Sequence, residues 1–216
     1  MREKIIEEIQ EKKLIAIVRG LPQAQIVPLA SALIAGGISL IEVTFDQQEP
    51  TSWQGTANAI AAIGAAHPTK ARVGAGTVMN LQQLRLARDA GAKFIISPHA
   101  EETIIRETRA LGLVSLPGCL TPTECAQAHA WGADFIKVFP AGSLGAGYIK
   151  AIKAPLRHLR LLAVGGVNEK NIPAFLRAGA EGFGVGGNLV DKTLVAAGRF
   201  DEITALAREY VKALDA

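Results

Sequence analysis

Eight short apolar segments recur along the chain at nearly even spacing, and this repeat restricts the fold more than any other feature. They are rich in Ile, Leu, Val and Gly, and successive segments start about 24 residues apart. The segments are 14–19, 40–45, 71–78, 94–98, 113–118, 135–140, 159–166 and 182–187. Apolar and polar residues alternate little within them, which is typical of parallel strands covered on both faces. The repeat therefore predicts a mostly parallel β-sheet.

The segments between these strands are predicted to be helices. Thr121, Pro122 and Glu124 form a capping-box pattern, which marks the start of a helix. Glycines that are typical of helix ends stand a few residues before five of the strands. These glycines are Gly36 with Gly37, Gly91, Gly112, Gly132 and Gly179. A strand–helix unit repeated eight times is the pattern of an α/β fold of the (β/α)8 TIM-barrel type.

An open doubly wound sheet is the competing architecture. It usually has five or six strands and a Gly-x-Gly-x-x-Gly turn after the first of them. Residues 17–22 read Ile-Val-Arg-Gly-Leu-Pro and lack that turn. Eight regular units therefore favour closure into a barrel. With about 150 residues per domain as a guide, the length of 216 residues predicts a single compact TIM-barrel domain over 1–216.

The first residues are surplus to the eight units and predict an extra N-terminal helix over 1–13. Ile5, Ile6 and Ile9 lie on one face of this helix. Such an apolar face has to be covered, so it either closes the bottom of the barrel or packs against another subunit.

The composition excludes several classes of partner. A chain that is 49% hydrophobic and 20% charged is too apolar for intrinsic disorder. Its apolar runs stop short of the roughly 18 residues that a membrane span needs. The net charge of +3 comes without a polybasic run, so neither a membrane nor a nucleic acid is expected as a partner. The charged N-terminus is unlike a secretory signal, and two cysteines fit a reduced, cytoplasmic protein.

Two charged residues interrupt the apolar strands. Glu42 lies inside the second strand and Lys137 inside the sixth, each between apolar neighbours. Alternate strands of a TIM barrel contribute to the same interior layers, so the two side chains can face one another across its mouth. One interpretation is a buried structural ion pair. The other is catalytic, because burial lowers the pKa of a lysine and frees its amine to attack a carbonyl, while a carboxylate moves protons.

Two glycine clusters predict a phosphate site. Gly165 and Gly166 end the seventh strand, and Gly186 and Gly187 end the eighth. The loops after these two strands are the usual phosphate site of TIM barrels. Glycines let backbone N–H groups approach an anion closely, although they also form ordinary tight turns.

Four further residues stand at strand ends and are candidates for substrate binding. Arg19 could clamp a carboxylate or be an ordinary surface arginine, and Thr77 could donate its hydroxyl or cap a strand end. Pro117 could expose strand-end carbonyls to a ligand or form a plain turn. Phe139 could supply an apolar wall beside Lys137 or be an ordinary core residue.

The sequence indicates no metal site. The four histidines do not share the spacing of metal ligands, and Cys119 and Cys125 lack a histidine partner. We therefore predict that the protein uses neither a metal ion nor another cofactor.

Several motifs occur in the order found in one known family. The chain resembles the 2-keto-3-deoxy-6-phosphogluconate (KDPG) aldolase family, some members of which also cleave 4-hydroxy-2-oxoglutarate. The resemblance covers about residues 13–190, nearly the whole barrel. The motifs are IEVTF at 41–45, VGAGTV at 73–78, FIISP at 94–98, PGCLTPTE at 117–124, FIKVFPA at 135–141 and VGGVN at 164–168. The resemblance implies a metal-free class I aldolase that is typically a homotrimer and acts on a phosphorylated 2-keto acid.

The resemblance also assigns roles to residues. The family's Schiff-base lysine falls on Lys137, and its proton-transferring glutamate falls on Glu42. A threonine that helps to hold the pyruvyl carboxylate matches Thr77. The family's phosphate-binding glycines fall on Gly165, Gly166, Gly186 and Gly187. The implied reaction is reversible cleavage of KDPG to pyruvate and glyceraldehyde 3-phosphate.

Two positions depart from the pattern of well-known members. Asp46 stands where they carry an arginine, whereas Arg19 resembles other members that place an arginine at the end of the first strand. Val164 replaces a threonine that commonly precedes the glycines of the seventh strand, and it resembles the 6-phosphogalactonate branch. Val164 is thus the predicted specificity residue, and the C4 epimer is the alternative substrate. A barrel that binds phosphosugars but carries out another reaction is the remaining alternative.

Overall fold

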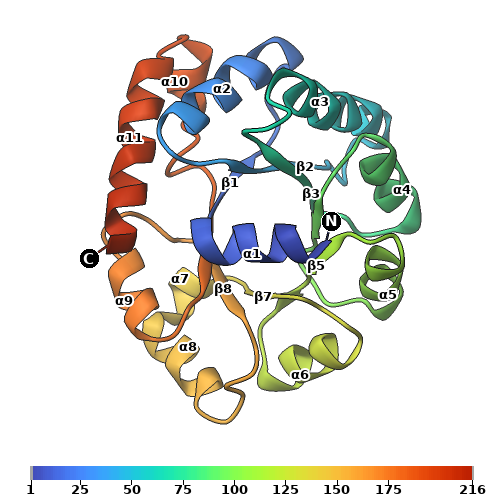
Figure 1. Cartoon of the computed structure of the whole chain (residues 1–216), viewed down its shortest axis with the longest axis vertical. Coiled ribbons are helices and arrows are strands. Elements are labelled where there is room, and N and C mark those ends of the chain that lie inside the picture. Colours follow the sequence, from blue (N-terminus) through green and yellow to red (C-terminus); the bar gives the residue numbers. More distant parts are fainter. Residues whose placement is uncertain (1, 216) are drawn as a thin grey trace.

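A parallel β-barrel surrounded by helices forms the protein, as the computed structural model of residues 2–215 shows (Figure 1). Nine strand segments pair in the order β5-β4-β3-β2-β1-β9-β8-β7-β6, and each of these pairings is parallel. The segments are β1 Leu14–Val18, β2 Leu40–Thr44, β3 Arg72–Gly76, β4 Phe94–Ile96, β5 Val114–Leu116, β6 Gly118–Cys119, β7 Ile136–Val138, β8 Leu161–Val164 and β9 Gly182–Val185. The predicted TIM barrel is confirmed, and the observed strands are shorter than the predicted ones.

The fifth predicted strand is divided in two at Pro117, which separates β5 from β6. Proline has no N–H group to donate to a neighbouring strand, so regular pairing is interrupted there. Hydrogen bonds nevertheless continue across this position to the next strand. The N–H of Phe135 donates to the Ser115 carbonyl at 3.3 Å, and the N–H of Lys137 donates to the Pro117 carbonyl at 2.9 Å. Together β5 and β6 therefore act as one of eight strands around the barrel.

Helices alternate with the strands and form an outer ring around the barrel, except that the N-terminal helix lies across the centre of the barrel (Figure 1). They are α1 Arg2–Lys12, α2 Gln23–Ala35, α3 Trp53–Ala66, α4 Leu81–Asp89, α5 Glu102–Ala110, α6 Pro122–Ala130, α7 Ala141–Leu144, α8 Ala146–Lys153, α9 Ile172–Arg177, α10 Lys192–Ala196 and α11 Phe200–Lys212, with short 3-10 turns at Pro50–Ser52 and Ala213–Asp215. The predicted capping box is present, since the Thr121 hydroxyl accepts from the N–H of Glu124 and the Glu124 carboxylate accepts from the N–H of Thr121.

The N-terminal helix α1 closes one end of the barrel, which decides between the two alternatives for its apolar face. Its residues Ile5, Ile6 and Ile9 are almost fully buried and pack with inward-facing residues such as Leu40 and Phe94, which start β2 and β4. Figure 1 shows α1 lying across the centre of the barrel. Burial of these side chains removes apolar surface from water and stabilises the closed end. Met1 of the predicted helix lies outside the described residues.

No helix between residues 2 and 215 has the length and apolarity needed to cross a membrane.

Ile9 is predicted to be important for stability because it is fully buried at the closed end. Ile9→Ala should lower the free energy of unfolding by about 2–5 kcal/mol, through lost burial and the cavity left behind. Glu7→Ala on the exposed side of the same helix is the control and should change it by less than about 0.5 kcal/mol. Urea unfolding of both variants measures the difference, and equal stabilities would contradict the role of α1 in closing the barrel.

Candidate active site

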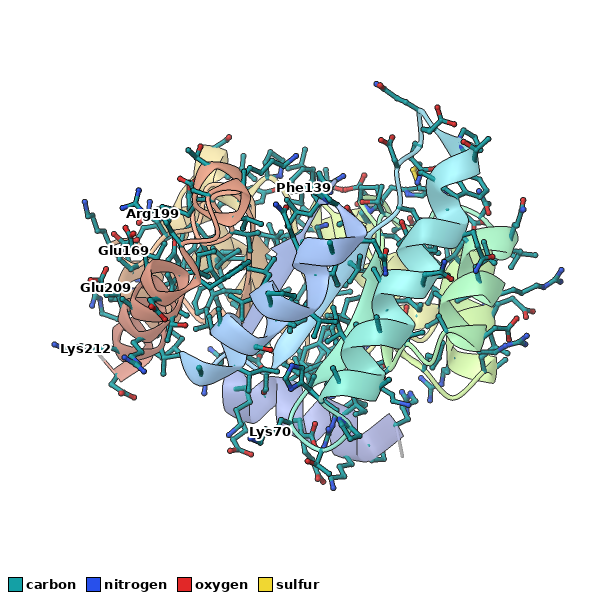
Figure 2. All side chains as sticks on the ribbon, turned by 90° about the horizontal axis from the view of Figure 1, so that it is seen from above. Lys70, Phe139, Glu169, Arg199, Glu209 and Lys212 are labelled. Atoms are coloured by element: carbon teal, nitrogen blue, oxygen red, sulfur yellow. The ribbon has the colours of Figure 1, made fainter. Side chains whose placement is uncertain are left out.

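A cavity of about 440 Å³ opens at the carboxyl ends of the strands, opposite α1. Figure 2 shows this polarity from the side, with Phe139 at one end of the barrel and Lys70, which precedes β3, at the other. The lining residues come from seven strand ends. They are Ile17, Arg19, Glu42, Thr77, Pro98, Lys137, Phe139, Val164, Gly165, Gly166, Val167, Gly184, Gly186, Gly187 and Asn188. The structure thus brings together all the site residues that were predicted from the sequence except Pro117.

Lys137 lies in the middle of β7, with its amine directed into the cavity and only 8% of the residue exposed. Burial lowers its pKa below the ordinary lysine value, because removal from water disfavours the charged amine. The negative charge of Glu42 opposes this effect, whereas the positive charge of Arg19 adds to it. The chain therefore provides a lysine that loses its proton more easily than an exposed lysine does.

Phe139 follows two residues after Lys137, and its ring centroid lies 5.0 Å from the Lys137 amine nitrogen Nζ. The residue is 40% exposed, so the interpretation as an ordinary core phenylalanine is wrong. Its ring lines the cavity and forms an apolar wall beside the amine, as the alternative interpretation predicts.

Glu42 lies in the middle of β2 and is only 1% exposed. Its oxygen Oε2 is buried without a hydrogen-bond partner, and burial raises the pKa of the carboxyl group against the opposing charges of Lys137 and Arg19. Among residues 2–215, the ion pairs within 4.0 Å do not include Glu42 with Lys137. A close structural ion pair is therefore not what holds these two groups inside the barrel.

The space for the Glu42 side chain is provided by glycine on the neighbouring strand. In the parallel register of β2 and β3, Glu42 is the partner of Gly74, and Thr44 is the partner of Gly76. A Cβ atom at Gly76 would lie 1.6 Å from Glu42 Oε1, a distance that no side chain can tolerate. The absence of a side chain at Gly76 is therefore a condition for the observed position of the carboxylate.

Arg19 and Thr77 meet at the mouth of the cavity. Arg19 directly follows β1, and its Nη2 donates a hydrogen bond to Thr77 Oγ1 at 3.2 Å. Thr77 directly follows β3 and has a φ of 55°, in the left-handed region that β-branched residues rarely adopt. The guanidinium and the hydroxyl together form a polar, positively charged corner on which a carboxylate can bind.

The two glycine clusters line another wall of the same cavity. Gly165 and Gly166 have φ values of 86° and 73°, and such positive values favour glycine. A Cβ at Gly187 would meet nothing within 4 Å, and one at Gly186 would meet only Ile17, so this loop is open to a ligand. Backbone groups in such a glycine-rich corner can approach an anion directly.

Asn188 is a lining residue that sequence reasoning did not single out. Its Nδ2 donates to the Val167 carbonyl at 3.1 Å and so connects the loop after β9 with the loop after β8. The only sequence signal for it is its place directly after the glycine pair Gly186–Gly187, because an asparagine in a loop is otherwise common.

Pro117 and Asp46 lie outside the cavity. The carbonyl of Pro117 accepts from the N–H of Lys137 at 2.9 Å, so Pro117 contributes to the hydrogen bonding between neighbouring strands of the barrel. Asp46 stabilises its own turn, where its Oδ1 accepts from the N–H of Gln48 at 2.9 Å. It lines a neighbouring cavity of about 550 Å³, which is bordered by α2 and α3 and also contacts Arg19. Of the two positions at which family members carry an arginine, the cavity thus includes that of Arg19 and not that of Asp46.

Within residues 2–215, no group of three or more His, Cys, Asp or Glu side chains is arranged to hold a metal ion.

A TIM barrel with a buried lysine, a buried glutamate and a positively charged corner at its open end can support aldol chemistry, and comparison with known proteins gives the same class. Residues 5–206 match the family model of KDPG and KHG aldolases, where KHG is 4-hydroxy-2-oxoglutarate. The chain belongs to the KDPG and KHG aldolase family. It is therefore a carbon–carbon lyase, and the alternative of a phosphosugar barrel with another reaction is set aside.

The relatives and solved structures that are similar to this chain are named for two different substrates. The chain is 38% identical over 180 residues to a probable 2-dehydro-3-deoxy-6-phosphogalactonate aldolase of Rhizobium meliloti. The aligned residues make up 83% of this chain and 82% of the relative. A solved structure of native KDPGal superposes with a TM-score of 0.84 at 32% identity, over 94% of both chains. The KDPG aldolase of Legionella pneumophila, solved with pyruvate captured as a covalent carbinolamine, gives a TM-score of 0.84 at 25% identity and covers 96% of this chain and 97% of its own.

Gly76→Ala tests whether the carboxylate of Glu42 needs its space beside β3. The new methyl group would occupy the position of Glu42 Oε1, so aldolase turnover should fall by about 100-fold or more, the usual effect of losing a positioned acid–base group. Gly64→Ala in α3 meets nothing within 4 Å and is the matched control, with turnover unchanged. Steady-state rates of the two variants give the comparison, and full activity of Gly76→Ala would show that the carboxylate position is not needed.

Proposed function

We propose that the protein is a Schiff-base aldolase that cleaves a 2-keto-3-deoxy-6-phosphosugar acid to pyruvate and glyceraldehyde 3-phosphate. The observation that carries this proposal is the pair of Lys137 and Glu42, both buried in the wall of one cavity beside an anion-binding corner. Each of the two substrate charges finds a matching polar group there. The carboxylate faces Arg19 and Thr77, and the phosphate faces the glycine loops.

Lys137 begins the reaction as a nucleophile. Its neutral amine attacks the C2 carbonyl carbon, and the resulting carbinolamine loses water to give a protonated imine. The lowered pKa of Lys137 supports this step, because it raises the share of amine that is unprotonated near neutral pH. The covalent carbinolamine of pyruvate in the Legionella pneumophila relative supports the same route in this chain.

Glu42 moves the protons. As the C3–C4 bond breaks, its carboxylate takes the proton of the C4 hydroxyl, directly or through a water molecule, and the aldehyde product forms. The bonding electrons move into the imine and give an enamine on Lys137. Glu42 then returns a proton to C3 of the enamine, and hydrolysis of the imine releases pyruvate. A carboxyl group whose pKa is raised by burial is suited to both the acid and the base half of this cycle.

The two ends of the substrate are held by different parts of the cavity. Arg19 and Thr77 bind the carboxylate next to C2, which places the carbonyl against Lys137. The phosphate is bound by the backbone of Gly165, Gly166, Gly186 and Gly187. The role of Pro117 in pyruvate binding is limited to the backbone bond that fixes the strand of Lys137.

Two observations favour the galactonate-derived substrate over the gluconate-derived one that was expected first from the sequence. Val164 is 5% exposed and lines the cavity just before the glycine loop, where its apolar side chain cannot donate a hydrogen bond to a substrate hydroxyl. The relative from Rhizobium meliloti carries the galactonate name at 38% identity. We therefore propose Val164 as the residue that sets the preference at C4, with 4-hydroxy-2-oxoglutarate as a poorer substrate because it lacks the phosphate.

We also propose that the protein is a homotrimer, as the family resemblance implies, and that it is cytoplasmic. Sedimentation equilibrium at several protein concentrations measures the assembly, and a mass close to three times 22.7 kDa is the expected result.

Trapping of the imine is the experiment that tests the proposed reaction. Borohydride reduction in the presence of pyruvate should attach the pyruvyl group to Lys137, as peptide mass spectrometry would show. Lys137→Ala should form no adduct and lose turnover, whereas Lys150→Ala, on the exposed side of α8, should behave like the wild type. An adduct on another lysine, or none in the wild type, would overturn the proposal.

Val164→Thr tests the preference at C4. The new hydroxyl can donate to a substrate hydroxyl, so the ratio of kcat/KM for the galactonate-derived to the gluconate-derived substrate should fall by about 10- to 100-fold. The half-saturation concentration of pyruvate in the trapping assay should not change, because pyruvate has no C4. A ratio equal to that of the wild type would assign the epimer preference to other residues.

A further inference from the structure

Thr77 occupies a backbone conformation that its own side chain disfavours. With φ at 55°, it is one of two non-glycine residues with positive φ in the part of the chain that the structure describes. A β-branched residue is strained in the left-handed region and persists there only where its surroundings hold it. Because Thr77 lines the cavity and contacts Arg19, the groups that hold it also determine the shape of this corner.

Two glutamine side chains hold the backbone of Thr77. Nε2 of Gln47, in the loop after β2, donates to the Thr77 carbonyl at 2.7 Å. Oε1 of Gln47 accepts from Nε2 of Gln83 at 3.1 Å, and Oε1 of Gln83 accepts from the N–H of Met79 at 2.8 Å. These bonds connect the loop after β2, the loop after β3 and the first turns of α4.

Gln83 is the buried member of this series of hydrogen-bonded side-chain amides. It is fully buried in α4, where its own N–H donates to the Asn80 side chain at 2.9 Å. Glutamine is rarely buried this completely, and the cost of removing its amide from water is offset only when its polar atoms are paired. Both ends of its side-chain amide are paired here, so Gln83 provides a rigid anchor for the exposed Gln47.

We propose that Gln47 and Gln83 are positioning residues for the carboxylate site, in addition to the residues that contact the substrate. They hold Thr77 in the left-handed conformation in which its hydroxyl faces Arg19, so that the corner is formed before the substrate binds. This inference rests on the proposed function, because it takes the carboxylate of a 2-keto acid as the group bound at Arg19 and Thr77.

The proposal makes a specific claim about kinetics. Neither glutamine lines the cavity, and their side-chain amides bond to Thr77, Met79 and each other and not to Lys137 or Glu42, so the chemical steps do not depend on the amides. Loss of the tether lets Thr77 relax and turns its hydroxyl away from Arg19. The variant therefore binds the carboxylate more weakly while kcat stays close to that of the wild type.

Gln47→Met is the test variant, since methionine has a similar length but cannot donate to the Thr77 carbonyl. The half-saturation concentration of pyruvate in borohydride trapping, and KM in cleavage, should rise about 3- to 10-fold, the value of one hydrogen bond, with kcat changed less than twofold. Gln48→Met is the matched control, because Gln48 is the next exposed residue and bonds to Asp46 through its backbone N–H. Its half-saturation concentration should equal that of the wild type.

A double-mutant cycle separates positioning from a general effect on stability. Thr77→Gly removes both the hydroxyl and the backbone strain, so Gln47→Met should have no further effect on pyruvate half-saturation in that background. Gln83→Met should behave like Gln47→Met and be equally silent in the Thr77→Gly background. Effects that add in full would show that the glutamines act on the whole fold and would overturn the inference.

The outcomes also separate this inference from the proposed function. A wild type that traps pyruvate on Lys137 while Gln47→Met has the same half-saturation concentration overturns only the positioning role. A wild type that forms no adduct with pyruvate overturns the proposed function and this inference together.

Discussion

The burial of two charged groups in an aliphatic barrel is the constraint on which the rest of the structure depends. Lys137 and Glu42 are both removed from water, and each would be expensive in a core that served stability alone. The fold meets this cost locally. Gly76 leaves room for the carboxylate, the opposite charges act on each other across the cavity, and α1 seals the far end of the barrel. The same burial moves the two pKa values toward one another, which is what proton transfer near neutral pH requires.

Much of the fold could be predicted from the sequence because its signals are local. Apolar runs of even spacing, glycines at helix ends and the Thr121 capping box identify the repeating unit without any long-range information. The break at Pro117 is different, since the continued hydrogen bonding of the Pro117 carbonyl to the N–H of Lys137 depends on the pairing with the neighbouring strand. The predicted strands extend beyond the ends of the observed strands for a similar reason. Arg19 and Phe139 follow apolar runs, but they point into the cavity instead of extending the sheet.

The candidate site divides in the same way. Lys137 and Glu42 could be found because a charge inside an apolar run is rare, and the glycine clusters because they stand at the expected strand ends. Gln47 and Gln83 could not be found, since a glutamine in a loop or an early helical turn looks like any solvated residue. Their proposed role depends on contacts in three dimensions, since Gln47 bonds to the Thr77 carbonyl and Gln83 bonds to Gln47, and the left-handed backbone of Thr77 leaves no mark in the sequence. The proposed substrate-binding residues are thus easier to predict than the residues proposed to hold them in place.

Within the described residues, α1 packs into one end of the barrel and the cavity opens at the other, and under the proposed chemistry this arrangement orders the release of the products. In the proposed reaction, pyruvate stays attached to Lys137 inside the cavity until hydrolysis frees it, whereas the phosphorylated aldehyde lies against the glycine loops. Under the proposed chemistry, both products leave by the same route. The fragment nearer the opening departs first, and in the reverse direction the keto acid enters before the aldehyde. While α1 stabilises the closed end, the depth at which the proposed covalent bond to Lys137 forms determines which product leaves the open end first.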